Sequence, residues 1–234
     1  MSNSYDKPEV TTAILVDGGF FLKRAKTLWG DASPETRAKQ LFTYCIEHLK
    51  SKNEYRRLYR IFYYDCPPLT NQQYHPLTDR TYYMKKTSHY SWMTDFHSEL
   101  RSKRKTALRF GEIAESQTEY TLKKDVLKKV CKKEISIDDL TEDDFKFNAP
   151  QKGVDMRIGL DIASLSYKKQ VNQIILISDD SDFVPAAKLA RREGVDFILD
   201  PMGAKMKSNL FEHIDGVETP KVHFKTSVTG TTEA

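Results

Sequence analysis

Residues 171–182, VNQIILISDDSD, carry the pattern that decides the fold. The apolar run 174–177 is uninterrupted by polar residues, so it predicts a strand buried on both faces, as in a parallel sheet. The run is followed closely by three acidic residues, Asp179, Asp180 and Asp182. Carboxylates this close repel one another, and a divalent cation or a helix N-terminus would relieve that repulsion. The stretch therefore predicts a central strand with a candidate site at its end.

The same order, a strand followed by an aspartate, recurs along the chain. Strands are predicted at 11–16, 58–64 and 195–199, ending at Asp17, Asp65 and Asp200. Helices are predicted at about 34–49, 151–167, 183–192 and 205–213, and the helix at 151–167 is expected to bury a stripe of Met156, Leu160, Ala163 and Tyr167. Alternating strands and helices require crossover connections. The expected fold is therefore a three-layer α/β/α, Rossmann-like architecture with a mostly parallel sheet.

The chain length favours a single domain over residues 1–225, followed by a polar tail at 226–234 that is expected to be disordered. The regular alternation loosens between about 71 and 150, which predicts an insertion into the core fold. Within it, 122–133 (LKKDVLKKVCKK) predicts an amphipathic helix with a lysine-rich face. The insertion is therefore expected to be a basic, partly helical segment.

The composition is that of a soluble globular protein, with 39% hydrophobic and 30% charged residues and a net charge of +4. No apolar run approaches the roughly 20 residues that span a bilayer, and the N-terminus does not resemble a signal peptide. The three cysteines are far apart and lack the spacing of a zinc site, so reduced thiols are expected. We therefore expect a cytoplasmic protein that does not bind membranes and for which nucleic acid is a possible partner.

The strand-end acids are expected to meet at one edge of the sheet. Ligands of such sheets bind beyond the carboxyl ends of the strands, where the strand order reverses. For Asp65 and Asp200, an ordinary turn or capping role is favoured. A shared metal site is favoured for Asp17, Asp155, Asp180 and Asp182. Such a carboxylate cluster suits Mg²⁺ or Mn²⁺, which can activate water for attack on a phosphodiester.

Three motifs then resemble a known family. ILVDGGFF, QKGVDMRIGLDIA and ILISDDSDFVPAAKLARREGVDFIL are similar to the NYN domain in its LabA-like bacterial branch, which belongs to the PIN-like nuclease superfamily. The resemblance implies a Mg²⁺- or Mn²⁺-dependent ribonuclease with a PIN-like fold that acts on RNA. By motif, it assigns the catalytic and metal-binding roles to Asp17, Asp155, Asp180 and Asp182. Asp161 also matches a family position, but helical geometry places it on a different face from Asp155.

One position departs from the family pattern. The loop usually reads S-G-D-S-D, whereas here Asp179 stands in place of the glycine. Aspartate tolerates a positive φ better than most residues, although at some cost, and its charge could strengthen metal binding or repel a phosphate. Ser178 and Ser181 could contact a ligand or cap the following helix, and the sequence leaves both roles open.

Basic residues supply candidate contacts to RNA phosphates. They are Arg104, Lys105, Lys124, Lys128 and Lys152, and the nearby aromatics Tyr82, Tyr83, Tyr90 and Trp92 could stack on bases or pack the insertion against the core. The lysine face could equally be an ordinary solvated helix surface.

The leading hypothesis is a metal-dependent endoribonuclease. The alternative is a catalytically weak RNA-binding or regulatory module. This alternative is suggested by Asp179, which stands where the family usually has glycine. A phosphatase is disfavoured, because the first strand ends in D-G-G and not in D-x-D. Dimerisation is left open, and a homodimer is possible.

Overall fold

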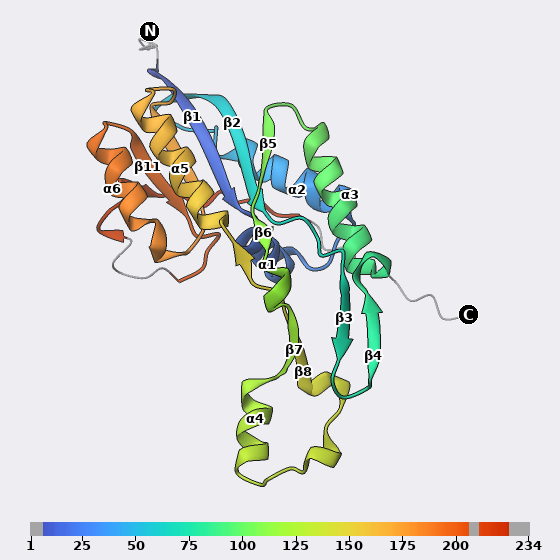
Figure 1. The fold of residues 1–234 in the computed structure, drawn as a ribbon. Helices are drawn as coiled ribbons and strands as arrows, with labels where there is room; N and C mark the ends of the chain where they lie inside the picture. The colour runs from blue at the N-terminus through green and yellow to red at the C-terminus, as the bar shows by residue number, and fades with distance from the viewer. Residues whose placement is uncertain (1–6, 206–210, 225–234) are drawn as a thin grey trace. The chain divides into compact units, whose positions relative to one another are not determined.

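A six-stranded sheet with the order β12-β11-β10-β1-β2-β5 forms the centre of the fold (Figure 1). The computed structural model describes residues 7–205 and 211–224. The strands of this sheet are β1 (Glu9–Asp17), β2 (Tyr55–Asp65), β5 (Thr106–Phe110), β10 (Gln173–Ile177), β11 (Asp196–Asp200) and β12 (Gly216–Val217). Every neighbouring pair in it is parallel. The predicted α/β fold with a mostly parallel sheet is confirmed.

Helices cover both faces of the sheet. They are α1 (Gly18–Trp29), α2 (Pro34–Glu47), α3 (Ser88–Ser102), α5 (Val154–Tyr167) and α6 (Val184–Arg192). Adjacent side chains of a strand point to opposite faces. In β2, the Tyr63 ring packs on Phe96 of α3, whereas the Tyr64 hydroxyl donates a hydrogen bond to Asp161 of α5. The helices α3 and α5 therefore lie on opposite faces, which gives the expected three layers.

The strand order reverses between β1 and β10. From β1 the chain first builds β2 and β5 on one side, and later β10, β11 and β12 on the other. In the register of β1 and β10, Val16 lies beside Ile177. The two strands therefore end side by side, and the residues that follow them meet at the switch point where ligands of such sheets bind.

The chain forms two compact units. The first comprises Met1–Asp65, Asp95–Gly111 and Gly153–Ala234, and the second comprises Cys66–Thr94 and Glu112–Lys152. The second unit falls largely within the predicted insertion at 71–150. Residues 95–111, in contrast, return to the first unit, where β5 extends the central sheet.

Antiparallel strand pairs build the second unit. They are β3 (Gln72–His75) with β4 (Arg80–Tyr83), β6 (Glu112–Ile113) with β9 (Gln151–Lys152), and β7 (Glu119–Leu122) with β8 (Phe145–Asn148). The unit also contains α4 (Lys124–Cys131) and the 3₁₀ turns η1 (Met84–Lys86), η2 (Glu115–Gln117), η3 (Ile137–Asp139) and η4 (Glu142–Asp144). Rings of His75, Tyr82 and Tyr120 pack together inside it. Tyr82 therefore packs within the second unit.

The buried face of α5 differs from the predicted one. Met156, Leu160 and Tyr167 are 69%, 61% and 62% exposed, so the predicted core stripe is wrong. The helix instead buries Val154, Ile158, Ile162 and Leu165. Two apolar stripes run along this helix, and periodicity alone does not indicate which one faces the sheet.

Two other predictions concern residues beyond the described ranges. The predicted helix at 205–213 lies mostly outside them, and the predicted tail at 226–234 lies wholly outside them. Across the described ranges, no helix is both long and apolar enough to cross a bilayer.

Gly18 allows α1 to begin directly after β1. A Cβ at this position would lie 2.5 Å from the Tyr63 hydroxyl oxygen and 2.5 Å from the Tyr64 carbonyl oxygen. The carbonyl belongs to the adjacent strand and cannot move aside. We expect Gly18→Ala to lower the free energy of unfolding by about 1–3 kcal/mol, measured by urea denaturation, because the added methyl overpacks the site.

Gly19→Ala is the matched control. A Cβ there would lie 3.6 Å from Asp17 Oδ1, an ordinary contact, and alanine favours helix over glycine. This variant should be as stable as the wild type or slightly more stable. Equal stability of the two variants would contradict the close approach of β2 to Gly18.

Candidate functional site

Asp17 lies at the end of β1 and caps helix α1. Its Oδ1 accepts a hydrogen bond from the Phe20 backbone N at 3.1 Å. The pKa of Asp17 is raised from 3.8 to about 6, first by burial and then by the negative charges of Asp155 and Asp65, against the hydrogen bonds from Phe20 and Ser178, which lower it. The ionised form of this carboxylate is therefore disfavoured in the fold. A bound cation would stabilise the ionised form and lower the pKa again.

Ser178 links Asp17 to the loop after β10. Its side chain is fully buried, and its Oγ lies 3.3 Å from Asp17 Oδ2, to which it donates. The same Oγ accepts a hydrogen bond from the Asp180 backbone N at 3.3 Å. Ser178 therefore fixes the loop against the first acid across the switch point. This is a positioning role, which differs from both roles that the sequence left open, contact with a ligand and capping of the following helix.

Asp180 and Asp182 belong to the turn that follows. Asp180 caps the 3₁₀ turn η5 (Ser181–Phe183), and its Oδ1 accepts a hydrogen bond from the Asp182 backbone N at 3.0 Å. Ser181 forms part of the same turn. The side chain of Asp182 is exposed, whereas Asp180 is half-buried. The turn thus presents two carboxylates beside the end of β10.

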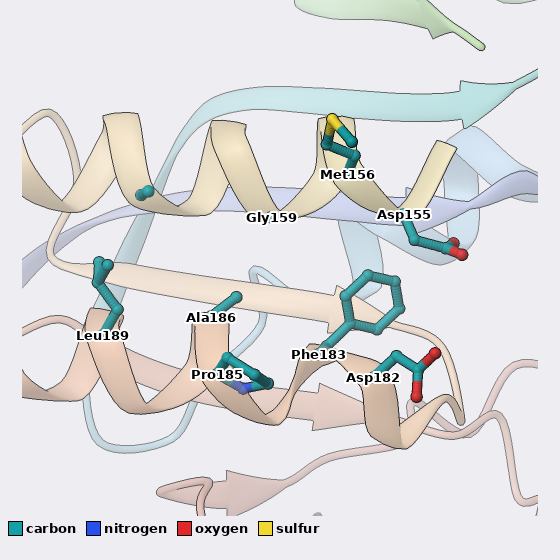
Figure 2. Close-up of a pocket in the computed structure, with 9 residues that line it drawn as sticks. Asp155, Met156, Gly159, Asp182, Phe183, Pro185, Ala186 and Leu189 are labelled. Carbon is teal, nitrogen blue, oxygen red and sulfur yellow. The ribbon is translucent and has the colours of Figure 1, made fainter. Parts of the chain in front are cut away.

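Asp155 comes from the first turn of α5 and lies near both of these acids. Burial raises its pKa, and the charges of Asp180 and Asp182 raise it further. Figure 2 shows the carboxylates of Asp155 and Asp182 at the same end of the paired helices α5 and α6. The predicted acids Asp17, Asp155, Asp180 and Asp182 therefore lie in one electrostatic neighbourhood, although they come from three separate segments.

The donor set is suited to a hard cation, because carboxylate oxygens are the ligands that Mg²⁺ and Mn²⁺ prefer. The mutual repulsion that raises the pKa of Asp17 and of Asp155 would be relieved by a positive ion. In the geometry of the described residues, however, no three His, Cys, Asp or Glu side chains come close enough together to hold a metal ion.

Asp179 is accommodated without backbone strain. It is half-buried, and it is absent from the non-glycine residues with positive φ in the described part of the chain. The backbone at position 179 therefore does not require glycine. Asp179 therefore differs from glycine at this position through its negative charge and not through backbone strain.

Three other aspartates have structural partners. Asp200 is fully buried and accepts hydrogen bonds from Tyr44 and Thr219, among other groups. Asp65 is buried beside Tyr63, whose hydroxyl donates to it at 3.0 Å. The Asp161 carboxylate accepts hydrogen bonds from Tyr64 and Arg109. All three aspartates are therefore hydrogen-bonded to other groups of the fold.

The predicted basic residues do not all lie near the acids. Arg104 and Lys105 precede β5, at the amino edge of the parallel sheet, whereas the acids lie at its carboxyl edge. The five residues of β5 span about 17 Å at 3.3 Å per residue. Exposed lysines of the second unit are Lys124 and Lys128 on α4 and Lys152 on β9.

His97 is a residue of this region that sequence reasoning missed. Its ring is buried, and its Nε2 lies 3.2 Å from Oδ2 of Asp65, the acid whose charge raises the pKa of Asp17. His97 therefore helps to position Asp65 behind the site. A single histidine in a helical segment gives no periodicity or motif signal, so only the fold could identify it.

Two comparisons with known proteins found a match, one to a family and one to a solved structure. The model of the NYN domain matches residues 12–213. No curated protein matches the chain. Among solved structures, the chain is similar to a protein of unknown function from Vibrio parahaemolyticus RIMD 2210633, with 12% sequence identity, a TM-score of 0.46, and coverage of 93% of this chain and 94% of that chain. On the family match, the chain belongs to the NYN domain family, part of the PIN-like nuclease superfamily.

Proposed function

We propose that this protein is a metal-dependent endoribonuclease that hydrolyses RNA phosphodiester bonds. The observation that carries the proposal is the gathering of Asp17, Asp155, Asp180 and Asp182 at the switch point of a parallel sheet, with the Ser178 hydroxyl joining two of their segments. Nuclease activity is also what membership of the PIN-like superfamily suggests.

These four aspartates would hold Mg²⁺ or Mn²⁺ once the cation draws their side chains together, since in the geometry of the described residues no three of them are close enough to hold it. Such an ion, when bound, activates water and stabilises charge on a phosphate. The chain's own contribution is to position the carboxylates. Asp17 is fixed by its helix cap and by Ser178, whereas Asp155 and Asp182 project from helix and turn at the same end of the α5–α6 pair. The exposed lysines 124, 128 and 152 are proposed to contact RNA phosphates.

A second candidate is a catalytically weak RNA-binding or regulatory module. The observation that favours it is Asp179, which adds a half-buried carboxylate beside the proposed site. Its backbone does not have a positive φ, so the conformation of the loop does not call for this residue. An additional negative charge at this place would repel a substrate phosphate.

The test is cleavage of end-labelled structured and unstructured RNAs with Mn²⁺, Mg²⁺ or a chelator. We expect metal-dependent cleavage by the wild type and a loss of at least about a hundredfold in Asp180→Asn, because a proposed ligand is lost. The asparagine Oδ1 can still accept the hydrogen bond from Asp182, so the turn should persist. Cleavage that survives this substitution, or that needs no metal, would refute the site.

Asp179→Gly separates the two candidates. It restores the residue that the family usually has and removes one charge. Binding of RNA without cleavage by the wild type would support the regulatory module, and a gain of cleavage in Asp179→Gly would assign the weak activity to that residue. Cleavage by both proteins supports the endoribonuclease.

Three finer expectations remain proposals. The three sequence motifs support membership of the LabA-like bacterial branch. The three cysteines are few and far apart in the sequence, which supports reduced thiols and a cytoplasmic setting. A homodimer is the proposed alternative to a monomer, and light scattering of the purified chain would decide between them.

A further inference from the structure

An apolar groove extends between α5 and α6 from the carboxylates of Asp155 and Asp182 (Figure 2). Its volume is about 390 Å³. Its walls include Met156, Gly159 and Ala163 from α5, with Phe183, Pro185 and Leu189 opposite. The groove therefore joins an acidic end to an apolar interior within one unit of the chain.

Small residues keep the groove open. A Cβ on Gly159 would meet no atom within 4 Å, and Ala163 adds only a methyl group to the same wall. The sheet-facing side of α5 is different, because Ile158 and Ile162 are fully buried there. The groove is therefore additional to the packing that stabilises the fold, and it is available to a ligand.

The acidic end and the apolar interior of the groove together restrict which kind of ligand can bind in it. Its walls carry no hydrogen-bonding side chain apart from the two carboxylates. A purely apolar partner, such as a peptide face, would cover these carboxylates without pairing them, which is costly. A nucleotide fits both ends, since its base is flat and uncharged and its phosphate can reach the acids through a bound cation.

We propose that this groove receives one unpaired nucleobase of single-stranded RNA, beside the phosphodiester bond that is cleaved. The proposal rests on the proposed ribonuclease function. A base within a duplex is paired and stacked, so it cannot enter a groove of this kind. Because the walls present no polar side chain to the edges of a base apart from the two carboxylates at one end, the groove accepts different bases with little discrimination.

The experiment compares the wild type with Gly159→Leu, which fills the groove. The substrates are an unstructured RNA and a series in which one abasic nucleotide is moved along the same RNA. With Mn²⁺, we expect the wild type to lose roughly five- to thirtyfold in kcat/KM at one abasic position, the range given by loss of the apolar contact between the base and the groove. Gly159→Leu should cleave the intact RNA with the lower kcat/KM that the wild type shows on that abasic RNA. Its kcat/KM should not fall further when the same nucleotide is made abasic.

Gly216→Leu is the matched control, because a Cβ on Gly216 in β12 also meets no atom within 4 Å and the residue is not part of the groove. It should cleave like the wild type. Ala163→Leu narrows the same wall and should reproduce the effect of Gly159→Leu. Thermal melts confirm that each variant folds.

The outcomes distinguish the groove from the nuclease. Absence of cleavage by the wild type on every RNA would refute the ribonuclease function and the groove proposal with it. Cleavage by the wild type, combined with unchanged or faster cleavage of the intact RNA by both groove variants, would refute the groove alone. Equal cleavage of intact and abasic RNAs by the wild type would also overturn it.

Discussion

Replacing Asp17 with asparagine is expected to abolish cleavage and, at neutral pH, to raise the free energy of unfolding by about 2–3 kcal/mol. Asparagine has nearly the same shape, and its Oδ1 can still accept the hydrogen bond from Phe20 that caps α1. It cannot carry the negative charge that a metal ligand supplies. The residue that the proposed activity requires is therefore one that weakens the fold.

The stability gain follows from the raised pKa of Asp17, which burial and the charges of Asp155 and Asp65 shift from 3.8 to about 6. Between these values, the folded protein retains a proton that the unfolded chain has released, so stability falls as pH rises through this window. Well below pH 3.8 the carboxyl is protonated in both states, and the cost vanishes. The advantage of Asp17→Asn should thus be full above pH 7 and small at pH 4.

Urea denaturation at pH 4 and pH 7.5 measures this difference, with the exposed Asp95→Asn as control. The control should change stability little at either pH. At pH 7.5, Mn²⁺ should raise the melting temperature of the wild type but not of Asp17→Asn, because ligand binding stabilises only a fold that binds it. A less stable Asp17→Asn at pH 7.5 would contradict the burial account, and normal cleavage would remove Asp17 from the site.

Replacing Asp200 with alanine is expected to lower the free energy of unfolding by about 3–5 kcal/mol. The carboxylate is fully buried at the end of β11. It accepts hydrogen bonds from the Tyr44 hydroxyl at 2.6 Å and from the backbone N of Met202 and the Thr219 hydroxyl, both at 2.7 Å, and its Oδ2 lies 2.8 Å from His48 Nε2. Alanine would leave the buried groups of Tyr44, His48 and Met202 without this partner.

Tyr44→Phe is the graded control, because it removes one of these hydrogen bonds and keeps the ring. It should cost about 1 kcal/mol. Both variants are measured by urea denaturation at pH 7.5. If Asp200→Ala were no less stable than Tyr44→Phe, the buried network would not account for the aspartate at this strand end, and a role in ligand binding would have to be reconsidered.

The strand-end acids show how far local patterns can be taken. The sequence predicted that Asp17, Asp65, Asp180 and Asp200 follow strands, and the structure has each of them at or just after one. It could not separate the acids near the proposed site from those with structural partners. That division depends on Tyr44, Tyr63 and His97, which approach from distant parts of the chain.

Helix α5 shows a second limit. Its existence and approximate bounds follow from periodicity, but its buried face does not, because apolar residues occur on more than one side. Asp161 accepts hydrogen bonds from Tyr64 and Arg109 of the sheet. In this orientation of the helix, Met156 and Leu160 are exposed. The groove beside α6 follows from this orientation and had no counterpart in the sequence pattern.

By itself, the sequence determined the class of fold and the family motifs, because uninterrupted apolar strands, helical spacing and the D-G-G and S-D-D-S-D turns are local properties. Only the tertiary structure decided which aspartates neighbour one another, that Ser178 is buried between two of their segments, and that Arg104 and Lys105 lie at the opposite edge of the sheet. These facts depend on strand order and on burial, which are set by contacts between residues far apart in the chain and which no local pattern encodes.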